Sequence, residues 1–267
     1  MSILRNGVSL AIALPLVGGL ATVTSLAPQT ANADPVAPCY YESRSGDTIN
    51  PPDSNSPECG IYKGEVSISK AYVDTVVNRK PWGRKLLKQA VLLDVRSIPE
   101  YKAGHPENSY NVPYPFIYQE CEKRQPDGAC IKGGTRIPQP AEDFVSYVEK
   151  IVPNKNTPIY TLCRTGVRSV GAANRLTEAG YKNVYNIWEG FVGVLLKAPF
   201  YVRDESGNVV YEDDKPLTES LEVDLNHDGE LTDADKNGWK YHGDLPYTKR
   251  LRPHLIYRPY VSYYWYD

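Results

Sequence analysis

PIYTLCRTGVRSVGAANRLTEAG, residues Pro158–Gly180, is the stretch of sequence that decides the fold. It begins with a short apolar run, Ile159–Leu162, that ends at Cys163. A segment with apolar residues at helical spacing follows, at Val170, Ala173 and Leu176. This order predicts a buried strand, a tight loop and a helix, with a cysteine at the end of the strand.

The loop Cys163–Arg168 combines a nucleophile with an anion-binding environment. A loop this short points successive backbone N–H groups inward, and the helix N-terminus behind it adds a positive partial charge. Together with Arg164 and Arg168, these groups favour the nucleophilic thiolate form of Cys163. A buried, inert thiol is the alternative. That alternative leaves the two arginines unexplained, because guanidinium groups avoid protein cores.

CRTGVRS resembles the active-site loop of the rhodanese-type sulfurtransferases. Three further elements in the same order resemble that family: VLLDVRSIPEYKAGH (Val91–His105), YNVPY (Tyr110–Tyr114) and GYKNVYNIWEGF (Gly180–Phe191). A last piece resembles it at Gly238–Pro246. The resemblance implies an α/β fold, with an open parallel sheet flanked by helices.

The resemblance also implies an activity. Cys163 takes a sulfane sulfur from a donor such as thiosulfate, holds it as a persulfide and passes it to a thiol or to cyanide. The substrate-binding residues are those of the loop: Arg164, Thr165, Gly166, Val167 and Arg168. Asp94 and Arg96 follow the predicted buried strand Val91–Val95 and are expected to support the loop as an ion pair, with direct substrate contact as the alternative. This chemistry needs no organic cofactor.

Three alternative functions stay open, and the third is a sulfurtransferase-like protein that acts on other chalcogen oxyanions. Cysteine phosphatases and arsenate reductases share the fold, but their loop has five residues between cysteine and arginine, whereas four separate Cys163 from Arg168. The shorter loop is too tight for a tetrahedral oxyanion but seats a single sulfur atom. The second alternative is a persulfide carrier or binding module of an exported redox system, which does not turn over small molecules.

Residues Met1–Ala33 are predicted to be an export signal. Arg5 precedes the apolar stretch Val8–Leu20, and Ala31-Asn32-Ala33 has the small residues of a cleavage site. Proline and glycine interruptions make a membrane anchor the weaker alternative. We therefore expect a periplasmic or secreted protein that begins at Asp34, with no stable membrane span after cleavage.

The five cysteines fit an oxidising compartment. An odd number predicts disulfide pairs and one free thiol, and Cys163 is the natural free residue. Proximity in sequence favours Cys39–Cys59 and Cys121–Cys130, although four cysteines allow three pairings. The second pair lies in Phe116–Pro140, an insertion relative to the minimal rhodanese domain that is expected to form one wall of the substrate entrance.

DLNHDGELTDAD, residues Asp224–Asp235, resembles a calcium-binding loop of EF-hand proteins and, more closely, of dockerins. Oxygen-bearing side chains at alternate positions and a glycine at the sharp turn are typical of such loops. The expected ligands are Asp224, Asn226, Asp228, Glu230 and Asp235. Because this loop has no second calcium loop to pair with, we expect a structural calcium ion rather than a regulatory switch. The alternative to calcium binding is a solvated polar turn.

The expected organisation has five parts: a signal peptide (1–33), an irregular N-terminal arm (34–64), the rhodanese-like core (65–193), an inserted hairpin with the calcium loop (194–237), and a closing segment with a Tyr-rich tail (238–267). The tail is expected to pack on the domain, with an exported protein partner as the alternative use of its aromatic side chains. A net charge of −2 argues against nucleic-acid binding.

Overall fold

In a computed structural model of the chain, the structure describes residues 61–77, 90–241 and 245–266. The chain divides into two units, 1–34 and 35–267, and all of the described residues belong to the second. The predicted signal peptide, the predicted Cys39–Cys59 pair and most of the N-terminal arm lie outside the described residues.

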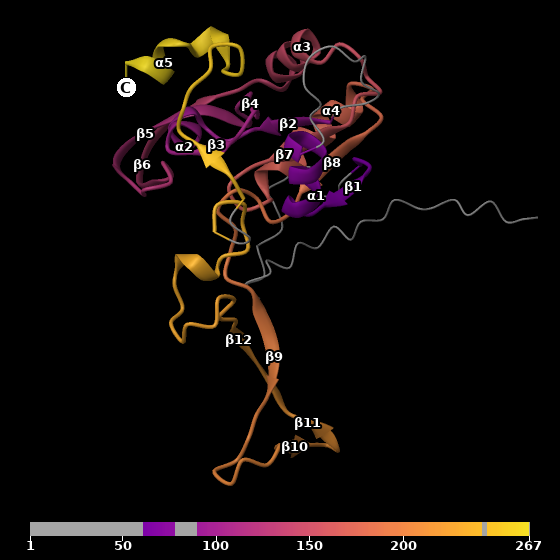
Figure 1. The fold of residues 1–267 in the computed structure, drawn as a ribbon, viewed down its shortest axis with the longest axis vertical. Coiled ribbons are helices and arrows are strands. Elements are labelled where there is room, and N and C mark those ends of the chain that lie inside the picture. Colours follow the sequence, from indigo (N-terminus) through magenta and orange to yellow (C-terminus); the bar gives the residue numbers. More distant parts are fainter. Residues whose placement is uncertain (1–60, 78–89, 242–244, 267) are drawn as a thin grey trace, which may run out of the picture. The chain divides into compact units, whose positions relative to one another are not determined.

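The domain is built on a sheet of five strands in the order β1-β8-β7-β2-β4, and all neighbouring strands are parallel (Figure 1). In chain order the strands are β1 (Gly64–Val66), β2 (Val91–Asp94), β4 (Tyr110–Asn111), β7 (Ile159–Leu162) and β8 (Val184–Ile187). β7, which ends immediately before Cys163, is the central strand. The predicted α/β class with a parallel sheet flanked by helices is confirmed.

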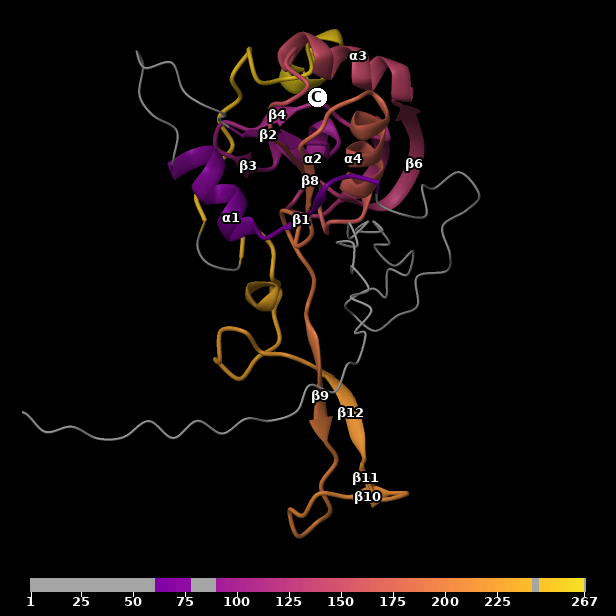
Figure 2. The same ribbon diagram turned by 90° about the vertical axis from the view of Figure 1, so that its right-hand side faces the viewer.

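Helices pack on both faces of this sheet (Figure 2). The helical elements of the core are α1 (Ile68–Tyr72), the π-helical turn η1 (Val73–Val77), α2 (Ile98–Lys102), α3 (Ala141–Ile151) and α4 (Arg168–Glu178). Successive strand residues enter opposite cores, as side chains alternate across a strand. Leu93 and Ile159 lie in one core with residues of α3 and α4, whereas Leu92 and Leu162 lie in the other with residues of α1.

From the sequence, Val66-Ser67-Ile68-Ser69 predicts a short strand that turns into a helix with Ser69 as its candidate N-cap, and the start of α1 differs from this prediction by two residues. Ser67, not Ser69, caps the helix, because its Oγ accepts a hydrogen bond from the backbone N–H of Lys70 at 3.2 Å. β1 ends at Val66, which leaves Ser67 as the extended residue that precedes the helix, and extended geometry is what an N-cap requires. The helix α3 begins directly after Pro140, as its sequence pattern predicts.

The segment Phe116–Pro140 forms an antiparallel hairpin of β5 (Phe116–Arg124) and β6 (Cys130–Pro138). Its register is irregular at several points, which is typical of strands with β-bulges. Cys121 and Cys130 are joined by a disulfide bond, with 2.08 Å between the sulfur atoms. We call this unit the disulfide hairpin.

A second insertion extends from Val194 to Asn237. The two positions are held together by hydrogen bonds in both directions, at 2.9 and 3.2 Å. Between them lie the strand pair β9 (Lys197–Tyr201) and β12 (Thr218–Glu222), the pair β10 (Tyr211–Glu212) and β11 (Lys215–Pro216), and the short helix η2 (Asp233–Asp235).

The closing segment then returns to the sheet. Trp239 is fully buried in the same core as Leu92, and its backbone N–H donates to the carbonyl of Gly190 at 3.0 Å. Only glycine fits at Gly238, since an added Cβ would lie 2.1 Å from the Val192 carbonyl carbon. β13 (Tyr247–Thr248) then pairs with β3 (His105–Pro106).

The C-terminal tail packs on the core through one face. It contains η3 (Arg258–Tyr260) and α5 (Ser262–Trp265). Tyr264 is buried, and its hydroxyl bonds to the Asn111 side chain beside β2. Trp265 and Tyr266 remain exposed. Among the described residues, no helix has the length and apolar character needed to cross a membrane.

An ion pair links α2 to the start of α4. Glu100 accepts two hydrogen bonds from Arg168, at 2.9 and 2.5 Å, and further bonds from the backbone and hydroxyl of Ser97. Burial alone would raise the pKa of Glu100, but the charge and hydrogen bonds of Arg168 outweigh it and lower the pKa to about 2. The pair therefore fixes the helix that follows the Cys163 loop to a separate part of the chain.

This lowered pKa predicts a specific loss of stability in acid. A carboxyl group with a depressed folded pKa contributes fully above its unfolded pKa, near 4.5, and loses the contribution as the pH falls to about 2. The Glu100→Gln protein should be less stable than wild type by about 2–3 kcal/mol at pH 7. The difference should shrink between pH 4.5 and 2.

Urea unfolding at a series of pH values measures this difference. Glu149→Gln is the matched control, because Glu149 pairs with Lys155 in a half-exposed position and its removal should cost less than about 1 kcal/mol. A pH-independent difference between wild type and Glu100→Gln would contradict the assignment.

Candidate active site

Cys163 lies at the carboxyl end of the central strand, where parallel α/β sheets place their sites. Its side chain is fully buried and belongs to the core formed with α3 and α4. Its backbone carbonyl accepts a hydrogen bond from Phe191 at 2.8 Å. The thiol is not part of a disulfide.

The segment Trp188–Gly193 determines the shape of the loop after Cys163. Gly166 has a φ of +84°, and a Cβ at this position would lie 2.0 Å from the Trp188 carbonyl oxygen. The carbonyl of Arg164 accepts hydrogen bonds from Val192 and Gly193, at 2.9 and 3.1 Å. The loop is thus pressed against the strand-to-turn segment that follows β8.

The inner edge of the loop offers hydrogen-bond donors. In the part of the chain that the structure describes, no acceptor is bonded to the backbone N–H groups of Thr165, Gly166 and Val167. These consecutive groups precede α4, whose N-terminus carries a positive partial charge. The arrangement is able to bind an anion through backbone donors alone.

Ser169 is a site residue that the sequence analysis did not assign. Its Oγ lies 3.2 Å from Cys163 Sγ and 3.2 Å from the Gly166 carbonyl oxygen. The hydroxyl proton serves one acceptor at a time, and a negatively charged sulfur is the stronger of the two. The signal was present in the sequence, since Ser169 closes the CRTGVRS stretch.

Both arginines of the loop already have carboxylate partners. Arg168 is bound by Glu100, as described above. Arg164 donates to Asp127 at 2.7 Å and to the Gln125 side chain at 2.8 Å, both from the turn of the disulfide hairpin. Burial would lower the pKa of Arg168, but Glu100 and the nearby Cys163 and Asp94 raise it, so this guanidinium stays charged.

Asp94 and Arg96 form a fully buried ion pair below the loop. The closest atoms are 2.6 Å apart, and Arg96 also donates to the backbone carbonyls of Glu100 and Gly104. The guanidinium lies 3.9 Å from the centroid of the Phe191 ring. Neither side chain has exposed surface. The supporting role of this pair stays a prediction.

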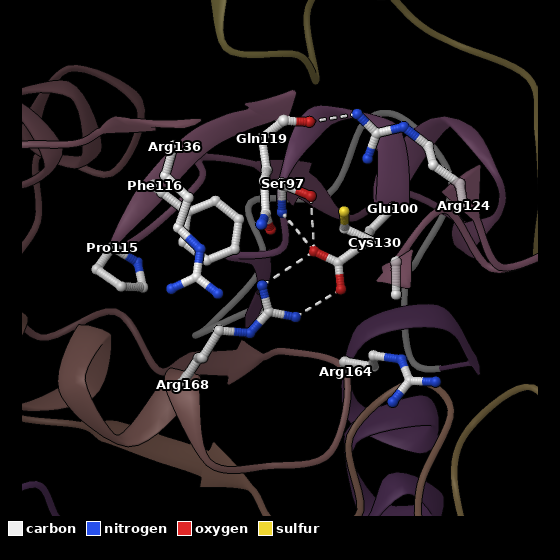
Figure 3. A pocket seen from close by; sticks show the side chains of 11 residues that line it. Ser97, Glu100, Pro115, Phe116, Gln119, Arg124, Cys130, Arg136, Arg164 and Arg168 are labelled. Atoms are coloured by element: carbon white, nitrogen blue, oxygen red, sulfur yellow. Dashed lines mark hydrogen bonds and ion pairs between the residues drawn. The ribbon is translucent and has the colours of Figure 1, made fainter. Parts of the chain in front are cut away.

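A pocket of about 350 Å³ lies between the Cys163 loop and the disulfide hairpin (Figure 3). Charged side chains dominate its wall: Glu100, Arg124, Arg136, Arg164 and Arg168. Phe116, Gln119 and Cys130 of the hairpin also line it. The hairpin thus forms one wall of this pocket, and its role at a substrate entrance stays a prediction. Cys163 itself lies beneath the loop and does not reach the pocket surface.

The loop Asp224–Asp235 contributes no residue to this pocket and is held by hydrogen bonds of its own. The side-chain oxygens of Asp224, Asn226, Asp228 and Asp235 all accept hydrogen bonds from backbone N–H groups of the same loop.

The described residues hold no group of three or more His, Cys, Asp or Glu side chains that is arranged to hold a metal ion. Calcium binding at this loop therefore stays a prediction from the order of its side chains, because oxygen ligands at this spacing are of the kind calcium accepts.

Comparison with known proteins supports the fold and the family. Residues 80–197 match the model of the "Rhodanese-like domain". The chain is 31% identical over 151 residues to "Rhodanese-like domain-containing protein 17" of Arabidopsis thaliana, covering 55% of this chain and 83% of that protein. It is 28% identical over 100 residues to "Thiosulfate sulfurtransferase 18" of Arabidopsis thaliana, covering 38% of this chain and 62% of that protein.

Among solved structures, the chain is similar to the protein described as "Crystal structure of Rv0390 from M. tuberculosis". The two share 23% sequence identity with a TM-score of 0.38, over 71% of this chain and 99% of that chain. The family match and the Arabidopsis relative, taken with the parallel sheet and the position of Cys163, show that the chain belongs to the rhodanese-like family.

Proposed function

We propose that the protein is an exported sulfurtransferase that carries a sulfane sulfur on Cys163 as a persulfide. The observation that carries this proposal is the surroundings of the thiol. Cys163 ends the central strand, Ser169 Oγ lies 3.2 Å from its sulfur, and the N–H groups of Thr165, Gly166 and Val167 have no acceptor in the described chain. These donors suit the negative charge that sulfur transfer develops.

The proposed reaction has two displacement steps. In the first, the Cys163 thiolate attacks the outer sulfur of thiosulfate, the sulfur–sulfur bond of the donor breaks, and sulfite leaves with the bonding electron pair. In the second, an acceptor thiolate or cyanide attacks the outer sulfur of the persulfide and restores the Cys163 thiolate. The loop N–H groups and Ser169 stabilise the negative sulfur in both states.

Access to Cys163 requires part of the pocket wall to move, because the thiol is fully buried. The hydrogen bonds of Arg164 to Asp127 and Gln125 connect the loop to the disulfide hairpin. An incoming anion competes with Asp127 for Arg164. We infer that this exchange opens the path to the sulfur.

Substitution of the nucleophile tests the proposal. Cys163→Ala should abolish thiosulfate:cyanide transfer and the addition of one sulfur atom to the protein, measured by intact mass after thiosulfate alone. Ser169→Ala keeps the nucleophile but loses one hydrogen bond to it, so turnover should fall about 10-fold while the persulfide still forms.

Two different results would contradict turnover with small molecules, and each favours a different alternative function. A persulfide that forms without transfer to small acceptors favours the carrier alternative, in which a protein receives the sulfur. Exposed Trp265 and Tyr266 in the tail are the aromatic side chains available to such a partner. An absence of both signals would favour some other anion at the loop.

We also propose that Asp224–Asp235 binds a structural calcium ion, with Asp224, Asn226, Asp228, Glu230 and Asp235 as the ligand residues. The proposal is supported by the order of oxygen-bearing side chains in the loop and by the sharp turn at Gly229, which has a φ of +87°. Export is supported by the Cys121–Cys130 disulfide, since such bonds persist in oxidising compartments.

Calcium removal should lower the melting temperature more than it lowers the rate of sulfur transfer. An ion present at about 100 times its Kd stabilises the folded state by about 2.7 kcal/mol, which corresponds to a shift of several degrees. Melting is measured with calcium and with chelator.

Asp224→Asn should lose the calcium response. Asp204→Asn is the matched control, because Asp204 also accepts N–H hydrogen bonds within a turn but lies outside the loop. The calcium assignment would be wrong if the wild-type protein melted at the same temperature with and without chelator.

A further inference from the structure

The disulfide hairpin contributes two arginines to the pocket, Arg124 and Arg136, that differ from the two of the loop (Figure 3). Arg164 and Arg168 are each matched by a carboxylate, Asp127 and Glu100. In the described part of the chain, neither Arg124 nor Arg136 forms an ion pair with a carboxylate. The pocket therefore holds two guanidinium charges that no acidic side chain neutralises.

Arg136 is the freer of these two. Its guanidinium lies 4.7 Å from the centroid of the Phe116 ring, and Arg168 approaches the same ring at 5.3 Å. Arg124 donates to the backbone carbonyls of Gln119 and Gly128, which orient it without removing its charge. A partly enclosed pocket with uncompensated positive charge attracts an anion.

The strand register explains why a polar group accompanies Arg136. Gln119 of β5 is the direct cross-strand partner of Arg136 on β6. Residues directly opposite in an antiparallel pair project from the same face of the sheet, and here both line the pocket. The Gln119 amide has no hydrogen-bond partner among the described side chains and supplies a further donor and acceptor.

The size of the pocket distinguishes between classes of anion. Its volume is about 350 Å³. A water molecule takes about 30 Å³ in the liquid, so the pocket has room for on the order of ten water-sized groups. The five heavy atoms of thiosulfate are about half of that number of water-sized groups. The volume is at the lower end of the range for pockets that hold small organic ligands.

We propose that the disulfide hairpin is a specificity element that binds the carboxylates of an organic thiol or persulfide at Arg136 and Arg124. Two uncompensated charges match a ligand with two carboxylates. This proposal rests on the proposed sulfur transfer at Cys163 and names the chemical class of its organic substrate. The guanidinium groups hold the carboxylates while the sulfur end of the ligand faces the loop.

Acceptor kinetics test the proposal, with thiosulfate as donor and two thiols as acceptors: mercaptosuccinate, which carries two carboxylates, and the neutral 2-mercaptoethanol. Arg136→Gln should raise the KM for mercaptosuccinate about 10-fold and change the KM for 2-mercaptoethanol less than about 2-fold. Lys132→Gln is the matched control. It removes a positive charge from the same strand, but Lys132 is exposed, pairs with Glu122 and does not line the pocket.

Equal changes of KM for the two thiols would overturn the proposal, as would a rise confined to thiosulfate, which would place the inorganic donor at Arg136. Persulfide formation is followed by intact mass in the same proteins. An Arg136→Gln protein that forms the persulfide but discriminates less between the thiols supports the proposal.

A binding measurement separates this proposal from the proposed transfer activity. Succinate, a dicarboxylate without sulfur, is titrated by calorimetry into the Cys163→Ala protein, which cannot turn over. Binding that is weakened about 10-fold by an added Arg136→Gln substitution, and less by Arg136→Lys, supports the carboxylate site even if transfer fails. If succinate binds equally to the Cys163→Ala protein with and without the Arg136 substitutions, the proposed carboxylate site is wrong, even if sulfur transfer is observed.

Discussion

The contact between Gly166 and the backbone of Trp188 is the constraint on which the rest of the site depends. A Cβ at position 166 would overlap the Trp188 carbonyl oxygen, so the loop after Cys163 exists in this form only because that position has no side chain. The same contact holds the loop in which the backbone N–H groups of Thr165, Gly166 and Val167 have no acceptor among the described residues. The segment after β8 is therefore part of the site.

Charge around the site is arranged in two layers with different roles. The buried Asp94–Arg96 pair and the Glu100–Arg168 pair fix the elements below and beside the loop, and removing either partner would leave a buried charge unmatched. The disulfide hairpin adds guanidinium groups that are not neutralised by carboxylates. The two ion pairs thus hold the elements around the loop in place. Among the described residues that line the pocket, only the guanidinium groups of the disulfide hairpin carry charge that a ligand is able to neutralise.

Two excursions of different character leave the same core. The disulfide hairpin returns after a short distance and forms the wall of the pocket, so it bears directly on what reaches Cys163. The segment between Val194 and Asn237 carries the acidic loop and is closed by Trp239, which fills the second core. The pocket wall and the acidic loop thus belong to separate additions to one parallel sheet.

The sequence by itself determined the strand, loop and helix around Cys163, because these depend on apolar spacing and on turn residues that are close together in the chain. The parallel sheet and a closing segment at Gly238–Pro246 were implied by the resemblance to the rhodanese-type sulfurtransferases. Ser69 was wrongly predicted as the N-cap of α1, because strand and helix patterns overlap at the short boundary around Ser67. Only the tertiary structure decided which arginines remain unpaired. Arg168 meets Glu100 across 68 residues and Arg164 meets Asp127 across 37, and no local pattern encodes contacts at such separations.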